Sequence, residues 1–218
     1  MDRILELAGD SAPFNSPLVA FVLTSLIIEM TPGPNMAYLA VLGASRGRLA
    51  GFSAVLGVAL GLALLGIAVG LGGGSLMLNN RVAYESLRWA GALYLCWLAF
   101  DSWREARQPI ATAPVSQSSH FIHFRRGFIT NLLNPKAAMF FIAVLPEFID
   151  RPAPSARELA LLVSIYVGIA TLVHGLIVVL AGGLQAFFAA SHRRKMAGNI
   201  FAALLLAIAV WLFVSARR

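Results

Sequence analysis

The sequence is poor in charged side chains and in cysteine. Of its 218 residues, 12% are charged and 59% are hydrophobic, whereas charged residues make up about 25% of an ordinary soluble domain. This shortage of charge excludes a soluble globular protein and predicts an integral membrane protein. The single cysteine, Cys96, excludes a disulfide within the chain and a metal site of several thiolates.

Sequence patterns typical of catalysis are missing as well. We find no nucleophile beside a base and no zinc-binding histidine pair of the H-E-x-x-H type, so we predict no enzyme, no cofactor and no metal site. His120 and His123 lie close together without an acid or cysteine beside them, and we interpret them as solvated loop histidines. A divalent-metal exporter would need a group of intramembrane ligands, and only Glu29 and His174 are evident.

Basic residues exceed acidic ones, 17 against 10, for a net charge of +7. Most of them stand between hydrophobic segments, so we attribute the excess to membrane orientation and to contact with anionic lipid rather than to nucleic acid. The loops after the first, third and fifth segments hold nine basic residues, and the opposite set holds seven. This difference favours N- and C-termini that both lie outside the cytoplasm.

Six hydrophobic segments are each long enough to cross a bilayer, which takes about 20 residues. They cover residues 16–42, 49–71, 82–103, 127–149, 157–188 and 197–214. We therefore predict one all-α transmembrane domain over residues 1–218. An odd number of spans in each half turns the second half upside down relative to the first, as in the inverted repeats of secondary transporters.

The halves are expected to cover residues 16–103 and 127–218. An acidic tail at residues 1–15 precedes the first half. A cytoplasmic linker at residues 104–126, which includes a flexible loop at 108–120, joins the two halves.

The first segment of each half is interrupted by proline. The interruptions are Glu29-Met30-Thr31-Pro32-Gly33-Pro34-Asn35 and the group Asn131, Asn134, Pro135 and Lys136. Proline removes a backbone donor and clashes with the preceding turn, so it opens the hydrogen-bond ladder of a helix. In a membrane the freed groups need protein, a water-filled cavity or a ligand. We therefore predict two broken helices that meet near the bilayer midplane and form a substrate site.

The candidate substrate-binding residues are those of the two breaks. They are Glu29, Thr31, Pro32, Gly33, Pro34, Asn35, Asn131, Asn134, Pro135 and Lys136. Charge inside a membrane is costly, so Glu29 and Lys136 should face the interior and have partners. Glu29 as a structural acid paired with an arginine, and Lys136 reaching water along its stem, remain alternatives. Glu29 and His174 are the candidates for proton coupling, and the alternative for His174 is a packed helix residue.

Two stripes of small residues predict close helix packing. The first, which indicates contact within the chain with a dimer face as the alternative, comprises Ser53, Gly57 and Gly61. The second, which we expect to face protein or a cavity rather than lipid, comprises Ser164, Gly168, Thr171 and Gly175.

Four stretches carry a resemblance to a known family. They are TPGPN at 31–35, GRLAG at 47–51, WAGALYL at 89–95 and FRRGFITNLLNPK at 124–136. These stretches resemble the lysine exporter (LysE/RhtB) superfamily of bacterial amino-acid exporters, and in particular its homoserine/threonine-type branch. The resemblance implies an inner-membrane secondary transporter that exports amino acids or close derivatives and is powered by the proton gradient. Substrates across the superfamily include cadmium, so export of another small solute or of a divalent cation remains the alternative.

An amino acid presents a carboxylate and an ammonium to such a site. The helix that restarts after Pro34 directs its positive end toward the carboxylate, where Lys136 could assist. Glu29 and the unwound carbonyls near Thr31 suit the ammonium or a proton. The expected partners are therefore an amino acid, protons and membrane lipid, and a homodimer remains open.

Overall fold

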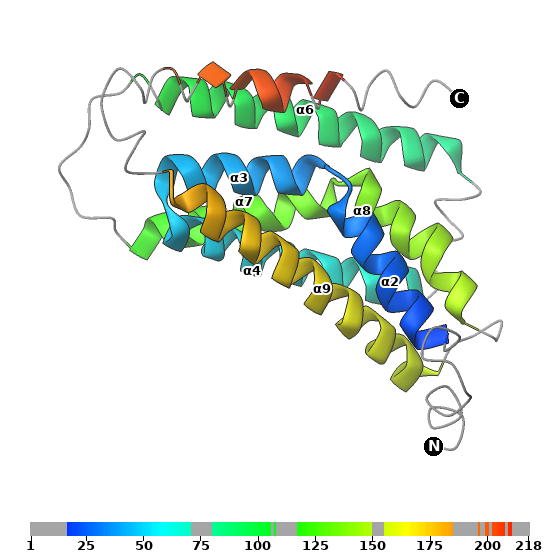
Figure 1. Ribbon diagram of the computed structural model, residues 1–218. Helices are drawn as coiled ribbons and strands as arrows, with labels where there is room; N and C mark the ends of the chain where they lie inside the picture. The colour runs from blue at the N-terminus through cyan, green and yellow to red at the C-terminus, as the bar shows by residue number, and fades with distance from the viewer. Residues whose placement is uncertain are drawn as a thin grey trace.

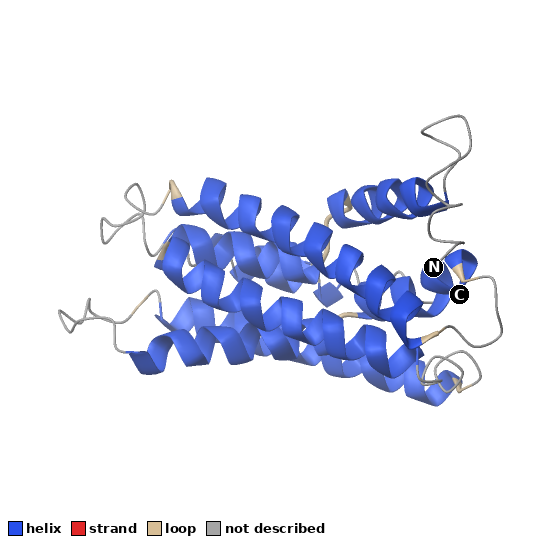
Figure 2. Cartoon of the chain, turned by 90° about the horizontal axis from the view of Figure 1, so that it is seen from below, coloured by secondary structure: helices blue, strands red, loops and turns tan. Residues whose placement is uncertain are grey.

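The computed structural model describes residues 17–70, 80–105, 107, 117–149, 155–184, 196, 199–200, 202–207 and 209–210. Within these residues the regular structure is helical throughout and no strand occurs (Figure 2), which confirms the all-α prediction for this part of the chain. The predicted acidic tail at 1–15, the turn between the second and third segments, and the basic loop before the sixth segment lie outside the described residues.

Both predicted helix breaks are present. The first separates α2 (Pro17–Met30) from α3 (Pro34–Arg46), with a bend of 59°. The second separates α7 (Gln117–Leu132) from α8 (Pro135–Met139), and the direction changes there by 52°. The helix of α8 continues through a π-helical turn, η2 (Phe140–Val144), and a 3-10 turn, η3 (Leu145–Phe148).

Three uninterrupted helices accompany the broken ones in the described part of the chain. They are α4 (Arg48–Ala68), α6 (Arg81–Glu105) and α9 (Ala156–Gly182). In Figure 1, α9 crosses the bundle and contacts α2, α3 and α4, while α6 runs along one edge and contacts α7 and α8. Their ends lie within a few residues of the predicted ones, except that α9 ends at Gly182 rather than at the predicted residue 188; residues 185–188 lie outside the described residues.

Local hydrogen bonds explain how the helices stop and restart at the breaks. The Thr31 hydroxyl donates to the Ile27 carbonyl at 3.1 Å and so satisfies one of the free carbonyls at the end of α2. The Asn134 side chain accepts from the Lys136 amide at 3.0 Å and caps α8. Pro34 and Pro135 each occupy the first turn of the restarting helix, where a missing donor costs nothing.

The start of α7 corrects one prediction. The helix begins at Gln117, well before the predicted residue 127, and it includes part of the predicted loop and linker. His120 and His123 are therefore helical and not solvated loop residues. The His120 ring lies 3.2 Å from the Ser53 hydroxyl, and His123 is buried. The sequence before Phe124 is polar, so hydrophobicity did not indicate a helix there. Packing against α4 stabilises this part of α7 instead.

Glycines bring α4 and α7 into backbone contact. A Cβ atom on Gly57 would lie 2.0 Å from the Phe124 carbonyl oxygen, and one on Gly127 would lie 2.2 Å from the Ala54 carbonyl oxygen. Only glycine permits this approach, so the Ser53 to Gly61 stripe packs within the chain, as predicted.

The second stripe of small residues meets its predicted orientation toward protein or a cavity only in part, because Thr171 and Gly175 are half-buried and a Cβ atom on Gly175 would lie 3.5 Å from the Phe52 ring. Ser164 and Gly168 are exposed, and a Cβ atom on Gly168 would meet nothing within 4 Å. The buried face of α9 is the one that carries Tyr166, Ala170 and His174. Both faces repeat with a helical period, so periodicity alone could not choose between them.

Two of the described helices, α4 and α9, are long and apolar enough to cross a membrane, and the number rises to four if each bent pair forms one span. The predicted sixth span is described only in part. Its described residues are helical, and Ala202, Leu205 and Ala209 belong to the same buried cluster as Leu95 and Leu98 of α6. The described part of the chain is thus consistent with a membrane protein, while the complete six-span arrangement remains a prediction.

Candidate functional site

The two helix breaks meet in the middle of the bundle. The Asn35 side-chain amide donates to the Asn131 side-chain oxygen at 2.8 Å, and both residues are buried. The Lys136 ammonium donates to the backbone carbonyl of Thr31 at 2.6 Å. Each break thus supplies a polar group that the other binds, as expected for broken helices that share a site.

Glu29 lies at the end of α2 with an exposed fraction of only 4%. Its Oε1 atom accepts a hydrogen bond of 2.5 Å from the Tyr166 hydroxyl, and its Oε2 atom lies 3.5 Å from Nε2 of His174. Both partners belong to α9, so the alternative of an arginine partner does not describe this carboxyl. The carboxyl also sits at the negative end of the α2 dipole. This position favours a nearby cation.

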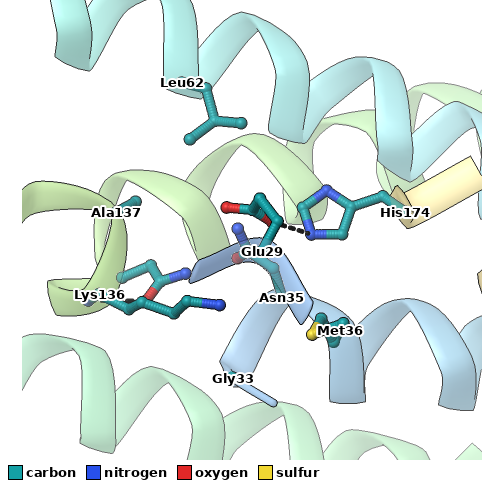
Figure 3. Close-up of a pocket in the computed structure, with 9 residues that line it drawn as sticks. Glu29, Gly33, Asn35, Met36, Leu62, Lys136, Ala137 and His174 are labelled. Carbon is teal, nitrogen blue, oxygen red and sulfur yellow. Dashed lines mark hydrogen bonds and ion pairs between the residues drawn. The ribbon is translucent and has the colours of Figure 1, made fainter. Parts of the chain in front are cut away.

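A small cavity lies between these groups (Figure 3). Its polar lining comprises Glu29, Asn35, Asn134, Lys136 and His174. Gly33, Met36, Leu62 and Ala137 complete the wall. The cavity measures about 10 Å³, which is room for about one water molecule. An amino acid is many times larger, so the cavity would have to widen to bind one, and we refer to this narrow state as the closed form.

Two residues that line the cavity carry a buried polar atom with no hydrogen-bond partner among the described residues, namely Oδ1 of Asn35 and Nδ1 of His174. The Ser25 hydroxyl and Nδ2 of Asn131, which do not line it, have none either. Unsatisfied buried polar atoms are rare because each one costs free energy. Both donors and acceptors are therefore available here for a polar solute.

The predicted site residues divide into three groups. Glu29, Gly33, Asn35, Asn134 and Lys136 line the cavity, together with the coupling candidate His174. Asn131, Pro34 and Pro135 are buried but do not line it, and Asn131 connects the two breaks through its hydrogen bond with Asn35. Thr31 and Pro32 are exposed, and Thr31 contributes only its backbone carbonyl.

Tyr166 is a site residue that sequence reasoning missed. It is fully buried on α9, about two helical turns before His174 and on the same face. Two polar side chains on one face of a largely apolar helix indicate a buried polar site. The small residues on the opposite face of α9 form a pattern of the same period and favoured that face instead.

A metal site has little support in the described residues. Glu29 and His174 do lie together, yet no group of three or more His, Cys, Asp or Glu that could hold a metal ion occurs in the part that the structure describes.

Comparison with known proteins identifies a family and several relatives of this chain. The family model described as LysE type translocator matches residues 26–216. A homoserine/homoserine lactone efflux protein of Salmonella typhi is 30% identical over 205 residues, which is 91% of this chain and 96% of that protein. A leucine efflux protein of Enterobacter sp. (strain 638) is 32% identical over 132 residues, which is 60% of this chain and 62% of that protein.

An uncharacterized membrane protein of Vibrio cholerae is 33% identical over 132 residues, which is 61% of this chain and 64% of that relative. No solved structure matches the chain. The family and the named relatives are transport proteins of membranes, so this protein is a transporter and not an enzyme, as the sequence predicted. The match over residues 26–216 covers most of the chain, which therefore belongs to the LysE-type translocator family.

Proposed function

We propose that this protein is a secondary active exporter that moves an amino acid or a close derivative out of the cytoplasm in exchange for protons. The observation that carries the proposal is the meeting of the two helix breaks around Glu29, Lys136 and the two amides Asn35 and Asn134. A buried acid, a cation and neutral hydrogen-bonding groups together complement a zwitterion. The small, closed cavity suits a solute that is bound and released by alternating access.

The full architecture that we propose has six spans in two inverted three-helix halves, in the bacterial inner membrane, with both termini outside the cytoplasm. The described structure supports the repeat in one respect: each half opens with a broken helix. The portions before the breaks, α2 and α7, contain 14 and 16 residues.

Substrate binding replaces the Lys136 contact in this proposal. The substrate ammonium takes the Thr31 carbonyl, which Lys136 occupies at 2.6 Å in the closed form, and lies near Glu29. Lys136 is then free to approach the substrate carboxylate, which also faces the amides at the start of α3. The neutral groups of Asn35 and Asn134 accept or donate the remaining hydrogen bonds.

Substrate export is coupled to proton entry if Glu29 binds either a proton or the substrate ammonium but not both. From the cytoplasm, the ionised carboxylate binds the ammonium, and the loaded site opens outward. Outside, a proton replaces the departing substrate and neutralises the carboxyl for the return. The protein can change the side of the membrane that its site faces when Glu29 holds the substrate or a proton, but not when the carboxylate is charged and empty. One proton therefore enters for each substrate that leaves.

The names of the relatives indicate which substrates to test first. Homoserine, homoserine lactone and leucine have uncharged side chains. The cavity wall at Met36, Leu62 and Ala137 is apolar and would accept a side chain of this kind. We therefore propose a small or medium amino acid with a neutral side chain, or its lactone.

The test loads cells with dipeptides, each containing one amino acid, and follows the free amino acid inside and outside. Expression of this protein in an exporter-deficient strain should speed the release of at least one amino acid, and Glu29→Gln should remove the dependence of release on external pH. Glu147→Gln is the matched control because Glu147 is an exposed acid on η3. Release of no amino acid, or release of a metal ion or another solute instead, contradicts the proposal.

A further inference from the structure

Tyr166 connects the buried acid to the second broken helix. Its hydroxyl donates to Glu29 at 2.5 Å, and its ring stacks on Phe140 with the ring centroids 3.6 Å apart and the planes 9° from parallel. The ring of Phe141 meets it edge-on at 5.2 Å. One side chain thus contacts the proton-binding candidate at its tip and the continuation of α8 along its face.

The segment that Tyr166 contacts has irregular helical geometry. Phe140–Val144 is a π-helical turn, and Leu145–Phe148 is a 3-10 turn. Pro146 has no amide hydrogen, and its ring crowds the carbonyl four residues earlier, which explains why the regular ladder fails here. Turns of this kind occur frequently at functional sites.

The bond between Tyr166 and Glu29 depends on the charge of the carboxyl. A hydroxyl that donates to a carboxylate forms a short bond about twice as strong as one between neutral groups, and the length of 2.5 Å is in the range of that stronger type. When a proton binds Glu29, the acceptor becomes neutral and the bond weakens. His174 on α9 and Lys136 on α8 also face this carboxyl, but neither approaches it as closely as Tyr166 does.

We propose that Tyr166 is a positioning residue that transmits the protonation of Glu29 to the second broken helix and so controls the opening of the cavity. The inference rests on the proposed proton-coupled export and deepens it. With Glu29 ionised and no substrate ammonium beside it, the hydroxyl holds the Tyr166 ring, and the ring holds Phe140 and η2 in the closed position. With Glu29 protonated, the ring and the stacked Phe140 are released together, and the π-helical turn shifts.

The test separates coupling from binding in proteoliposomes. Exchange of radiolabelled for unlabelled homoserine, homoserine lactone or leucine across the membrane requires binding and opening but no net proton movement. Accumulation of the same probes against their gradient, driven by an imposed pH gradient, requires coupling. Tyr166→Phe removes only the hydroxyl, so exchange should stay within about twofold of wild type. The pH-driven accumulation should fall about tenfold, as expected for one lost hydrogen bond to a charged group.

Two further variants sharpen the result. Phe140→Leu keeps the bond to Glu29 but removes the ring stack, and it should uncouple transport in the same way. Tyr94→Phe is the matched control because its hydroxyl lies on α6, 3.5 Å from the Arg126 carbonyl, away from the cavity. It should leave both assays unchanged.

Three outcomes overturn the inference. The first is undiminished pH-driven accumulation in Tyr166→Phe, and the second is coupled transport in Phe140→Leu; both leave the proposed function intact. The third is an equal loss of exchange and accumulation in Tyr166→Phe at normal protein levels, which would make Tyr166 a plain binding or structural residue. If the wild-type protein exchanges none of the three probes, the proposed function fails instead.

Discussion

Replacing Lys136 by methionine should open the cavity between the breaks. The Lys136 ammonium binds the Thr31 carbonyl at 2.6 Å, and its stem lies across Gly33, where a Cβ atom would come within 3.1 Å of Cδ. This contact is a direct bond between the first break and the second. Methionine keeps a similar unbranched stem but has no ammonium, so it removes the bond with little change in packing.

The size of the effect follows from the kind of bond that is lost. A hydrogen bond to a charged group contributes about 1.5–3 kcal/mol. Thr31 is exposed, so the lower end of this range applies. A loss of about 1.5 kcal/mol from the closed form changes the ratio of open to closed molecules about tenfold.

Cysteine labelling can measure this change. Met36 lines the cavity, and Met36→Cys in a Cys96→Ala background would carry a single thiol, since Cys96 is the one native cysteine. A water-soluble maleimide should label this thiol about tenfold faster when Lys136→Met is added, in proportion to the open population. Lys136→Arg, which keeps the cation, serves as the control and should label more slowly. Equal labelling rates with lysine and methionine would refute the idea that this contact holds the cavity closed.

Three other predictions concern the helix breaks and the packing behind them. Pro135→Ala should lower export several-fold without lowering the amount of protein in the membrane, because it lets the ladder close across the break; normal export would show that the bend is only architectural. Gly57→Ala should destabilise the protein by about 1–3 kcal/mol through overpacking, seen as a lower melting temperature in detergent, whereas Gly168→Ala should not; equal effects would contradict the assigned packing. A double-mutant cycle on Asn35→Ala and Asn131→Ala should show a coupling free energy of about 1 kcal/mol, and strictly additive losses would count against their hydrogen bond.

The features that could be predicted from the sequence are those with a local cause. Pro32, Pro34 and Pro135 each stand well inside a long apolar segment, where proline interrupts a helix, so both breaks were predictable in type and place. The packing of Gly57 and Gly61 followed from their spacing in the same way. Charge patterning also predicted that Glu29 and Lys136 face the interior and have partners, and in the structure Glu29 is buried and Lys136 is half-buried.

The features that could not be predicted depend on distant contacts. The partners of Glu29 are Tyr166 and His174, more than a hundred residues away on α9, and no local pattern connects them. The early part of α7 has a polar sequence and forms a helix because it docks on α4, so its start was placed too late. The stripe around Gly168 was assigned to the inner face of α9 because two faces share one period.

Reconstituted protein offers the most direct test of proton-coupled export through Glu29. Liposomes filled with homoserine or leucine and a pH-sensitive dye, with equal pH on both sides, should become acidic inside as the substrate leaves through the wild-type protein. Glu29→Gln should abolish this acidification, and the exposed control Glu147→Gln should leave it intact. Substrate efflux without acidification, or the same acidification in Glu29→Gln as in wild type, would contradict the mechanism.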